Sequence, residues 1–163
     1  MDFGADREAL EGQAVAKPAS AGLSIVVPVY NEAEGLPRLH QRLATVARRL
    51  RDTSGIACEV IYIDDGSHDE TLAVARALPA DGADVQVVSL SRNFGKEAAL
   101  LAGLDHARRG AVLFIDGDGQ HPPELIETLV GHWLRGYDVV YTAKSRRDNE
   151  PLLRRVGVKG FMR

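Results

Sequence analysis

The stretch AVLFIDGDGQHPPE, residues 111–124, decides the fold class of this chain. Its apolar first part, residues 111–115, is bounded by turn-forming residues, a pattern that is typical of a short buried strand. Side chains two positions apart on an extended chain point to the same side. Asp116, Asp118 and Gln120 are therefore expected to present three oxygen ligands together where the chain leaves a sheet.

Residues 116–124, here called the acidic motif, suit a divalent cation. Two carboxylates and an amide oxygen are hard donors of the kind that Mg²⁺ and Mn²⁺ prefer, and an ion held by so few protein ligands keeps positions for phosphate oxygens. Gly117 and Gly119 have no side chains, so we expect a ligand to approach the backbone closely there. A polar turn between a strand and a helix is the simpler alternative, and the motif alone leaves both open.

Spacing excludes two other kinds of site. A calcium-binding loop that starts at Asp116 would place Glu127 correctly at its twelfth position, but it needs Gly where His121 stands, and a strand precedes it instead of a helix. A dinucleotide-binding fingerprint that starts at Gly117 needs Gly where Pro122 stands.

The chain alternates between strand-like and helix-like segments. The expected strands are residues 23–30, 58–63, 85–90, 111–115 and 137–143. The expected helices are residues 36–50, 67–78, 96–108 and 122–135. Ser67 and Glu70 have the spacing of a capping box, and Gly136 stands where a helix would end. Strands separated by helices of this length predict βαβ units and a mostly parallel sheet.

A polar cluster follows every expected strand, and in open parallel sheets the ligand crevice lies beyond the carboxyl ends of the strands. The clusters are Asn31 with Glu32, Asp64 with Asp65, residues 91–97, the acidic motif, and Lys144 with Arg146 and Arg147. Acids and bases around one crevice suit a nucleoside diphosphate bridged by a metal ion, which would neutralise charge on a departing diphosphate. Arg147 and Lys144 would offset the remaining charge, although an exposed basic turn is the simpler interpretation of these two residues.

Three further residues are candidates for nucleotide contacts. The ring of Tyr30 suits a base, Asp65 suits a base N–H or a sugar hydroxyl, and Lys96 at a helix N-terminus suits phosphate. Each also has a structural interpretation, because a Tyr at a strand end commonly packs and an Asp before Gly-Ser commonly makes a turn.

Composition and charge indicate one soluble globular domain. The chain has 163 residues, with 45% hydrophobic and 26% charged side chains. A formal net charge of −3 gives no reason to expect nucleic acid as a partner. Cys58 is the only cysteine, so no internal disulfide can form. Residues 1–22 lack the apolar core of a secretory signal and are expected to be a flexible tail.

Four motifs in this order carry a family resemblance: VVPVYNE (26–32), IDDGSHDET (63–71), SRNFGKEAALLAGL (91–104) and DGDGQHPPE (116–124). They resemble the inverting family-2 glycosyltransferases, within them the polyprenyl-phosphate branch that includes dolichol-phosphate mannose synthase. The resemblance covers residues 23–163. It implies the GT-A fold, which is a Rossmann-like α/β three-layer sandwich with a mostly parallel sheet.

The resemblance also implies an activity and site residues. The expected reaction moves a sugar from a UDP- or GDP-sugar to a polyprenyl phosphate with inversion, using Mg²⁺ or Mn²⁺. The residues that the resemblance implies for nucleotide binding are Pro28, Tyr30, Glu32 and Asp65, and Lys96 is added to them because of its place at a helix N-terminus. The expected metal ligands are Asp116, Asp118 and Gln120. Lys144 and Arg147 are expected to bind phosphate, with Asp118 and Arg147 as the catalytic pair and Arg154 or Arg155 nearby.

The resemblance has departures. Lys144 stands where Arg is common, and both intervening positions of the acidic motif are Gly. Relatives continue further, so residues 23–163 are expected to be a C-terminally truncated domain without the acceptor side and any membrane helices. The family works at the cytoplasmic face of the membrane, although this chain carries no apolar run long enough to anchor it. A homo-oligomer is left open.

Three rival interpretations follow. A nucleotide-sugar-binding fragment without turnover is the first, because of the expected truncation. A phosphoacceptor signalling domain is the second, but its acid pair should follow the first strand, where Asn31 and Glu32 stand. A nicotinamide-dependent reductase is disfavoured by the missing glycine fingerprint.

Overall fold

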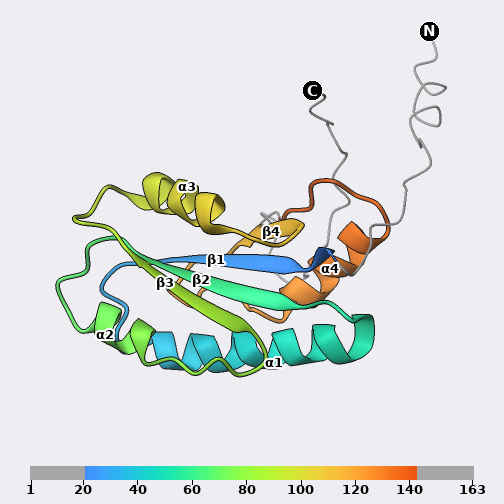
Figure 1. Cartoon of the computed structure of the whole chain (residues 1–163), viewed down its shortest axis with the longest axis horizontal. Helices are drawn as coiled ribbons and strands as arrows, with labels where there is room; N and C mark the ends of the chain where they lie inside the picture. The colour runs from blue at the N-terminus through green and yellow to red at the C-terminus, as the bar shows by residue number, and fades with distance from the viewer. Residues whose placement is uncertain (1–20, 143–163) are drawn as a thin grey trace, which may run out of the picture. The chain divides into compact units, whose positions relative to one another are not determined.

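Four parallel strands form the sheet, in the order β3-β2-β1-β4, in the computed structural model, which describes residues 21–142 (Figure 1). The strands are β1 (Leu23–Val29), β2 (Cys58–Asp64), β3 (Asp84–Ser89) and β4 (Ala111–Phe114). The helices are α1 (Leu36–Ser54), α2 (Thr71–Arg76), α3 (Lys96–His106) and α4 (Leu125–Leu134). The predicted α/β class and parallel sheet are confirmed.

Residues 21–127 belong to one compact unit, and residues 128–142 belong to a second. In the first unit, α3 covers one face of the sheet and α1 and α2 cover the other, which makes three layers (Figure 1). Within residues 21–142, no helix combines the length and the apolar character that crossing a bilayer requires.

The core lies around β1 and β2, the two central strands. Six of the seven residues of β1 and all seven of β2 are buried, as expected of parallel strands that are covered on both faces. The predicted apolar stripe of α1 packs against them, with all five of its members buried: Leu36, Leu39, Leu43, Val46 and Leu50. The helix ends at Gly55, whose positive φ of 68° allows its N–H to bond back to the Arg51 carbonyl.

Gly103 allows α3 to pack close against the sheet. A methyl group built on Gly103 would lie 2.1 Å from Cγ1 of Val26 on β1. Val26 belongs to a buried cluster with Ile61, Ile63 and Ala99, so the helix and two strands share this contact. The glycine therefore lets the helix backbone rest directly on the sheet.

The structure differs from the sequence-based expectation at two helix starts. The predicted capping box is wrong: α2 begins at Thr71 without a side-chain cap, and the Ser67 hydroxyl instead accepts the Asn31 N–H at 2.9 Å. The predicted start of α4 at residue 122 is three residues early. The carbonyls of Pro122 and Pro123 accept the N–H groups of residues 125 and 126 in a turn before the helix.

The expected fifth strand is also not found. Residues 137–142 form no strand, and residue 143 lies outside the described range. Side chains that favour strands are not enough to form one, because the backbone N–H and C=O groups of a strand need a neighbouring strand to pair with. Within the described part of the chain, β4 pairs only with β1.

Two glycine substitutions test the packing of α3. We expect Gly103→Ala to lower the free energy of unfolding by about 1–3 kcal/mol, because the added methyl group overpacks the contact with Val26. Gly131→Ala in α4 is the control, since its methyl group would meet nothing within 4 Å. It should raise stability by about 0.5–1 kcal/mol through helix propensity. Urea denaturation measures both, and equal effects of the two variants would contradict this account of α3.

Candidate functional site

The candidate site lies at the carboxyl ends of the strands, where four loops carry most of the predicted residues. Tyr30 and Glu32 follow β1, Asp65 follows β2, and Asp116 follows β4. Lys96 is the first residue of α3, after β3. Lys144, Arg147, Arg154 and Arg155 lie outside the described residues.

The loop after β1 is tied to the loop after β2. The Asn31 side-chain oxygen accepts the His68 N–H at 2.9 Å, while the Asn31 N–H donates to Ser67. The Glu32 N–H donates to the Thr71 hydroxyl at 2.8 Å. Asn31 has a positive φ of 53°, which these bonds hold in place. Sequence reasoning missed this role of Ser67 and Thr71, although their place in IDDGSHDET was the available signal.

Asp69 is the central acceptor of this connection. Its Oδ1 accepts the N–H of Thr71 at 2.9 Å and the Thr71 hydroxyl, and its Oδ2 accepts the Ala33 N–H at 3.3 Å. These hydrogen bonds, led by the one from the Thr71 hydroxyl, lower the pKa of Asp69. The carboxylate therefore stays ionised, and the connection stays intact, until the pH falls through this lowered pKa.

Asp65 holds the loop that leads into α3. Its side chain is buried, and its two oxygens accept the N–H groups of Phe94 at 2.8 Å and Gly95 at 3.0 Å. The backbones also lie close together, since a methyl group on Gly66 would come within 2.4 Å of the Arg92 carbonyl carbon. Asp65 thus fixes the backbone immediately before Lys96. Its predicted contact with a base or sugar stays a prediction.

Lys96 and Asp116 form an ion pair between α3 and the acidic motif. Asp116 is the less exposed partner, at 29% of its side chain against 57% for Lys96. The Nδ1 atom of His121 lies 3.8 Å from the other oxygen of Asp116. One predicted metal ligand and one predicted phosphate ligand are therefore in direct contact.

Asp118 adds negative charge at the rim, which is the edge of the sheet formed by the carboxyl ends of its strands. The pKa of Glu32 is raised, first by burial and then by repulsion from the carboxylates of Asp118 and Asp69. These three acids come from the loops after β1, β2 and β4. Asp118 is exposed, and its Oδ1 accepts the backbone N–H of Gln120 at 3.0 Å. The role of the Gln120 amide as a ligand stays a prediction.

The acids of the motif supply at most part of the ligands of a divalent cation. Within residues 21–142, no three His, Cys, Asp or Glu side chains are grouped so that they could hold a metal ion by themselves. Asp116 already pairs with the ammonium group of Lys96, and burial and the carboxylates of Asp118 and Asp69 raise the pKa of Glu32. Hard oxygen donors in this number suit an ion that completes its shell with phosphate oxygens and water.

The two glycines of the motif have different surroundings, and the expected close approach of a ligand stays a prediction at Gly119 only. A methyl group on Gly117 would lie 2.6 Å from the Pro28 carbonyl oxygen and 2.7 Å from Cγ1 of Val29, so this residue packs against the end of β1. The expectation that a ligand approaches the backbone at Gly117 is wrong, because β1 fills that space. Gly119 has a positive φ of 73° with open space around it, so the turn requires it for its conformation.

The ring of Tyr30 is exposed to solvent where the chain leaves β1. It meets the His68 ring edge-on at a centroid distance of 6.4 Å. Pro28 is partly buried in β1. Both positions are compatible with the predicted nucleotide contacts.

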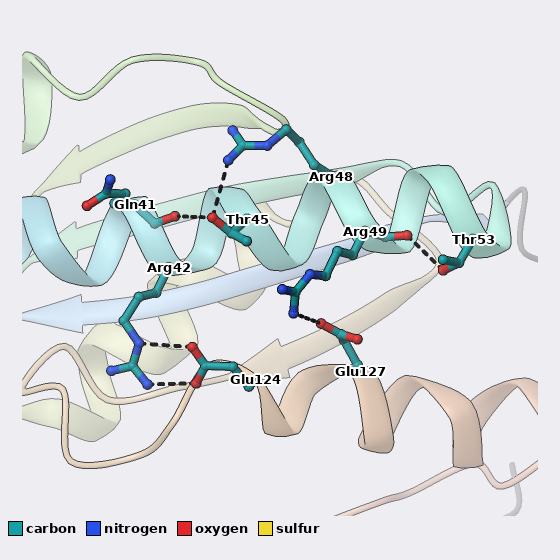
Figure 2. Close-up of polar contacts among 8 residues, drawn as sticks. All are labelled: Gln41, Arg42, Thr45, Arg48, Arg49, Thr53, Glu124 and Glu127. Carbon is teal, nitrogen blue, oxygen red and sulfur yellow. Dashed lines mark hydrogen bonds and ion pairs between the residues drawn. The ribbon is translucent and has the colours of Figure 1, made fainter.

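The far end of the acidic motif is clamped to α1 (Figure 2). Arg42 donates to both oxygens of Glu124, from Nε at 3.0 Å and from Nη2 at 2.6 Å. Two turns further along α1, Arg49 makes a single contact of 3.3 Å with Glu127. The hydrogen bonds from Arg42 lower the pKa of Glu124. With Gly117 packed on β1, the motif is held at both ends.

The family model and two similar proteins agree on one family. The family model described as glycosyl transferase family 2 matches residues 24–159. An uncharacterized glycosyltransferase of Synechocystis, sll0501, is 44% identical over 139 residues, which cover 85% of this chain and 42% of that protein. The undecaprenyl-phosphate 4-deoxy-4-formamido-L-arabinose transferase of Pseudomonas fluorescens is 40% identical over 133 residues, covering 81% of this chain and 38% of that protein. The chain thus spans less than half the length of these relatives.

A solved structure agrees with the fold. The mannosyltransferase PcManGT of Pyrobaculum calidifontis, determined with GDP-mannose and Mn²⁺, superposes with a TM-score of 0.57 at 25% identity. The match covers 77% of this chain and 36% of that protein. The predicted GT-A fold is confirmed.

The raised pKa of Glu32 predicts a pH-dependent gain in stability from Glu32→Gln. The folded state disfavours this carboxylate, so its ionisation costs stability at every pH above the raised pKa and nothing below the ordinary pKa of Glu. We expect the variant to melt at a higher temperature than the parent at pH 7, and the two to converge near pH 4. Glu34→Gln, which changes an exposed acid in the same loop, is the control. A gain that persists at pH 4 would contradict the electrostatic cause.

The Arg42 clamp predicts a local effect on the acidic motif. Arg42→Met keeps the apolar stem but removes both bonds to Glu124, so amide hydrogen exchange should speed up in residues 117–121. Arg49→Met, which loses one longer contact on the same helix, should leave these amides unchanged. Exchanging the charges with Arg42→Glu and Glu124→Arg should restore slow exchange. Equal exchange rates in the Arg42 and Arg49 variants would show that the clamp does not order the motif.

Proposed function

The chain belongs to glycosyl transferase family 2, and we propose that it provides the donor-binding part of an enzyme that moves a sugar from a nucleoside-diphosphate sugar to a polyprenyl phosphate with inversion. The observation that carries the proposal is the contact of Lys96 with Asp116 at the carboxyl edge of a parallel sheet, with the interacting acids Glu32 and Asp118 on loops that leave the same edge. Residues 23–163 are proposed as one incomplete domain of a longer protein, in keeping with its share of its relatives' length.

The donor would bind across this edge. We assign Asp116 and Asp118, with Gln120, to a divalent cation, Mg²⁺ or Mn²⁺, and Tyr30 and Pro28 to the nucleotide. When bound, such an ion neutralises the charge that develops on a departing diphosphate. The mannosyltransferase solved with GDP-mannose and Mn²⁺ supports this pairing of ligands. Asp65 supports the nucleotide site through the loop that it holds at residues 94 and 95.

The proposed acceptor is a polyprenyl phosphate, attacking from the side of the sugar opposite to the diphosphate. A phosphate monoester has a second pKa near 6, so much of it is dianionic at neutral pH. A strong general base is then less necessary than for a hydroxyl acceptor. The relative that is named as an undecaprenyl-phosphate transferase supports this acceptor class. Lys144 and Arg147 are proposed to bind the phosphates, with Arg147 as the stronger ligand because its planar fork matches phosphate oxygens.

A nucleotide-sugar-binding fragment without turnover is the second candidate. Its support is the coverage of the relatives, of which this chain matches 42% and 38%. Transfer from radiolabelled UDP- or GDP-sugar to a short polyprenyl phosphate, assayed for this chain and for a longer one, separates the candidates. Binding by both with transfer by the longer one alone would favour the fragment.

Calorimetric titration of UDP and GDP with and without Mn²⁺ tests the donor site. We expect Mn²⁺ to strengthen binding of the preferred nucleotide at least tenfold, and Asp118→Ala to remove most of this gain because it deletes a charged ligand. The control Asp52→Ala removes an exposed acid near the end of α1, whose contact is with Arg51. It should bind as the parent does. Binding that ignores both the metal and Asp118→Ala would overturn the proposed donor site.

A further inference from the structure

The ion pair between Lys96 and Asp116 places a cation of the protein on a proposed metal ligand. Two cations cannot share one carboxylate without repulsion, so a metal ion at Asp116 must displace the ammonium group or bind next to it at a cost. The pair is the direct observation here, and its interpretation as part of a metal site rests on the proposed function.

Helix stability does not account for a lysine at this position. Lys96 is the first residue of α3, where the helix dipole is positive and favours acids over bases. Its neighbour Glu97 follows that preference. The attraction that offsets the unfavourable placement is the carboxylate of Asp116, which comes from a different loop.

The side chain of Lys96 can move while its backbone stays fixed. Asp65 holds the N–H groups of Phe94 and Gly95, so the start of the helix is anchored. The Lys96 side chain is 57% exposed on a flexible four-carbon stem, and its ammonium is a point charge without a required geometry. It can therefore exchange one anionic partner for another within its reach.

We infer that Lys96 is an internal counter-cation that occupies Asp116 in the empty site and transfers to the diphosphate when the donor binds. The empty protein then binds metal weakly, because the metal competes with Lys96. Once a diphosphate engages the ammonium group, Asp116 is free for the metal. Metal and diphosphate thus strengthen each other's binding, and thermodynamic linkage requires the two effects to be equal.

The test measures the Mn²⁺ dissociation constant by electron paramagnetic resonance of free Mn²⁺, with and without saturating UDP or GDP, at pH 8, where histidine side chains are ordinarily neutral. Lys96→Met removes the charge and keeps a good helix-forming side chain. We expect it to tighten Mn²⁺ binding to the empty protein by about two- to fivefold, the range for a partly exposed ion pair. The strengthening of Mn²⁺ binding by the nucleotide should shrink by the same factor, and nucleotide binding itself should weaken.

Two matched variants separate this role from a general effect of charge. Arg92→Met removes one positive charge from the same loop, where the guanidinium lies over the Phe94 ring at 4.6 Å, and should leave Mn²⁺ binding unchanged. Lys96→Arg keeps the charge and should resemble the parent. Circular dichroism melts of all three verify that the fold is kept.

Each outcome has one meaning. Tighter Mn²⁺ binding in Lys96→Met alone supports the counter-cation. Unchanged or weaker Mn²⁺ binding in that variant, or equal effects of Lys96→Met and Arg92→Met, overturns it while leaving the donor site intact. If the parent chain binds Mn²⁺ in neither the presence nor the absence of nucleotide, the proposed donor site fails, and the inference fails with it.

Discussion

The burial of β1 between β2 and β4 is the constraint on which the candidate site depends. Its parallel neighbours end at the same edge, so the loops that leave them are forced together. The fit of Gly117 against the Pro28 carbonyl then fixes where the acidic motif starts relative to the other loops. A larger residue at that position would push the motif away from β1, the strand that Tyr30 and Glu32 follow.

The site concentrates like charges, and the surrounding contacts offset that cost. Burial and two neighbouring acids raise the pKa of Glu32, so its negative charge is unfavourable in the folded protein. Lys96 offsets the charge of Asp116 at the same edge of the sheet. The hydrogen bond from the Glu32 N–H to the Thr71 hydroxyl and the contact of Arg42 with Glu124 hold the loops that carry these acids. A rim arranged in this way gains most from binding a cation, which is a physical reason to associate it with a metal-bound diphosphate.

Much of the fold could be predicted from local patterns. The burial of the apolar residues 60–63 in β2, and the spacing of Leu36, Leu39 and Leu43 in α1, depend on residues only a few positions apart. The start of α2 could not be predicted in this way. Ser67 has the spacing of a helix cap, but a distant backbone N–H, that of Asn31, takes its hydroxyl. The prediction of a fifth strand was wrong for a similar reason. A strand needs a neighbouring strand to pair with, and residues 137–142 do not themselves determine whether one is there.

The sequence by itself determined which chemical groups gather at the edge: the acids, the lysine and the aromatic ring that follow strands of an alternating α/β chain. Hydrophobic periodicity and turn chemistry act over short distances along the chain, so these features could be read directly. Only the tertiary structure decided their partners. Asp65 turned out to hold a backbone loop, Lys96 to pair with Asp116, and Arg42 to bind Glu124 from 82 positions away. Such pairs form because folding brings distant loops together, and packing rather than spacing selects which charges meet.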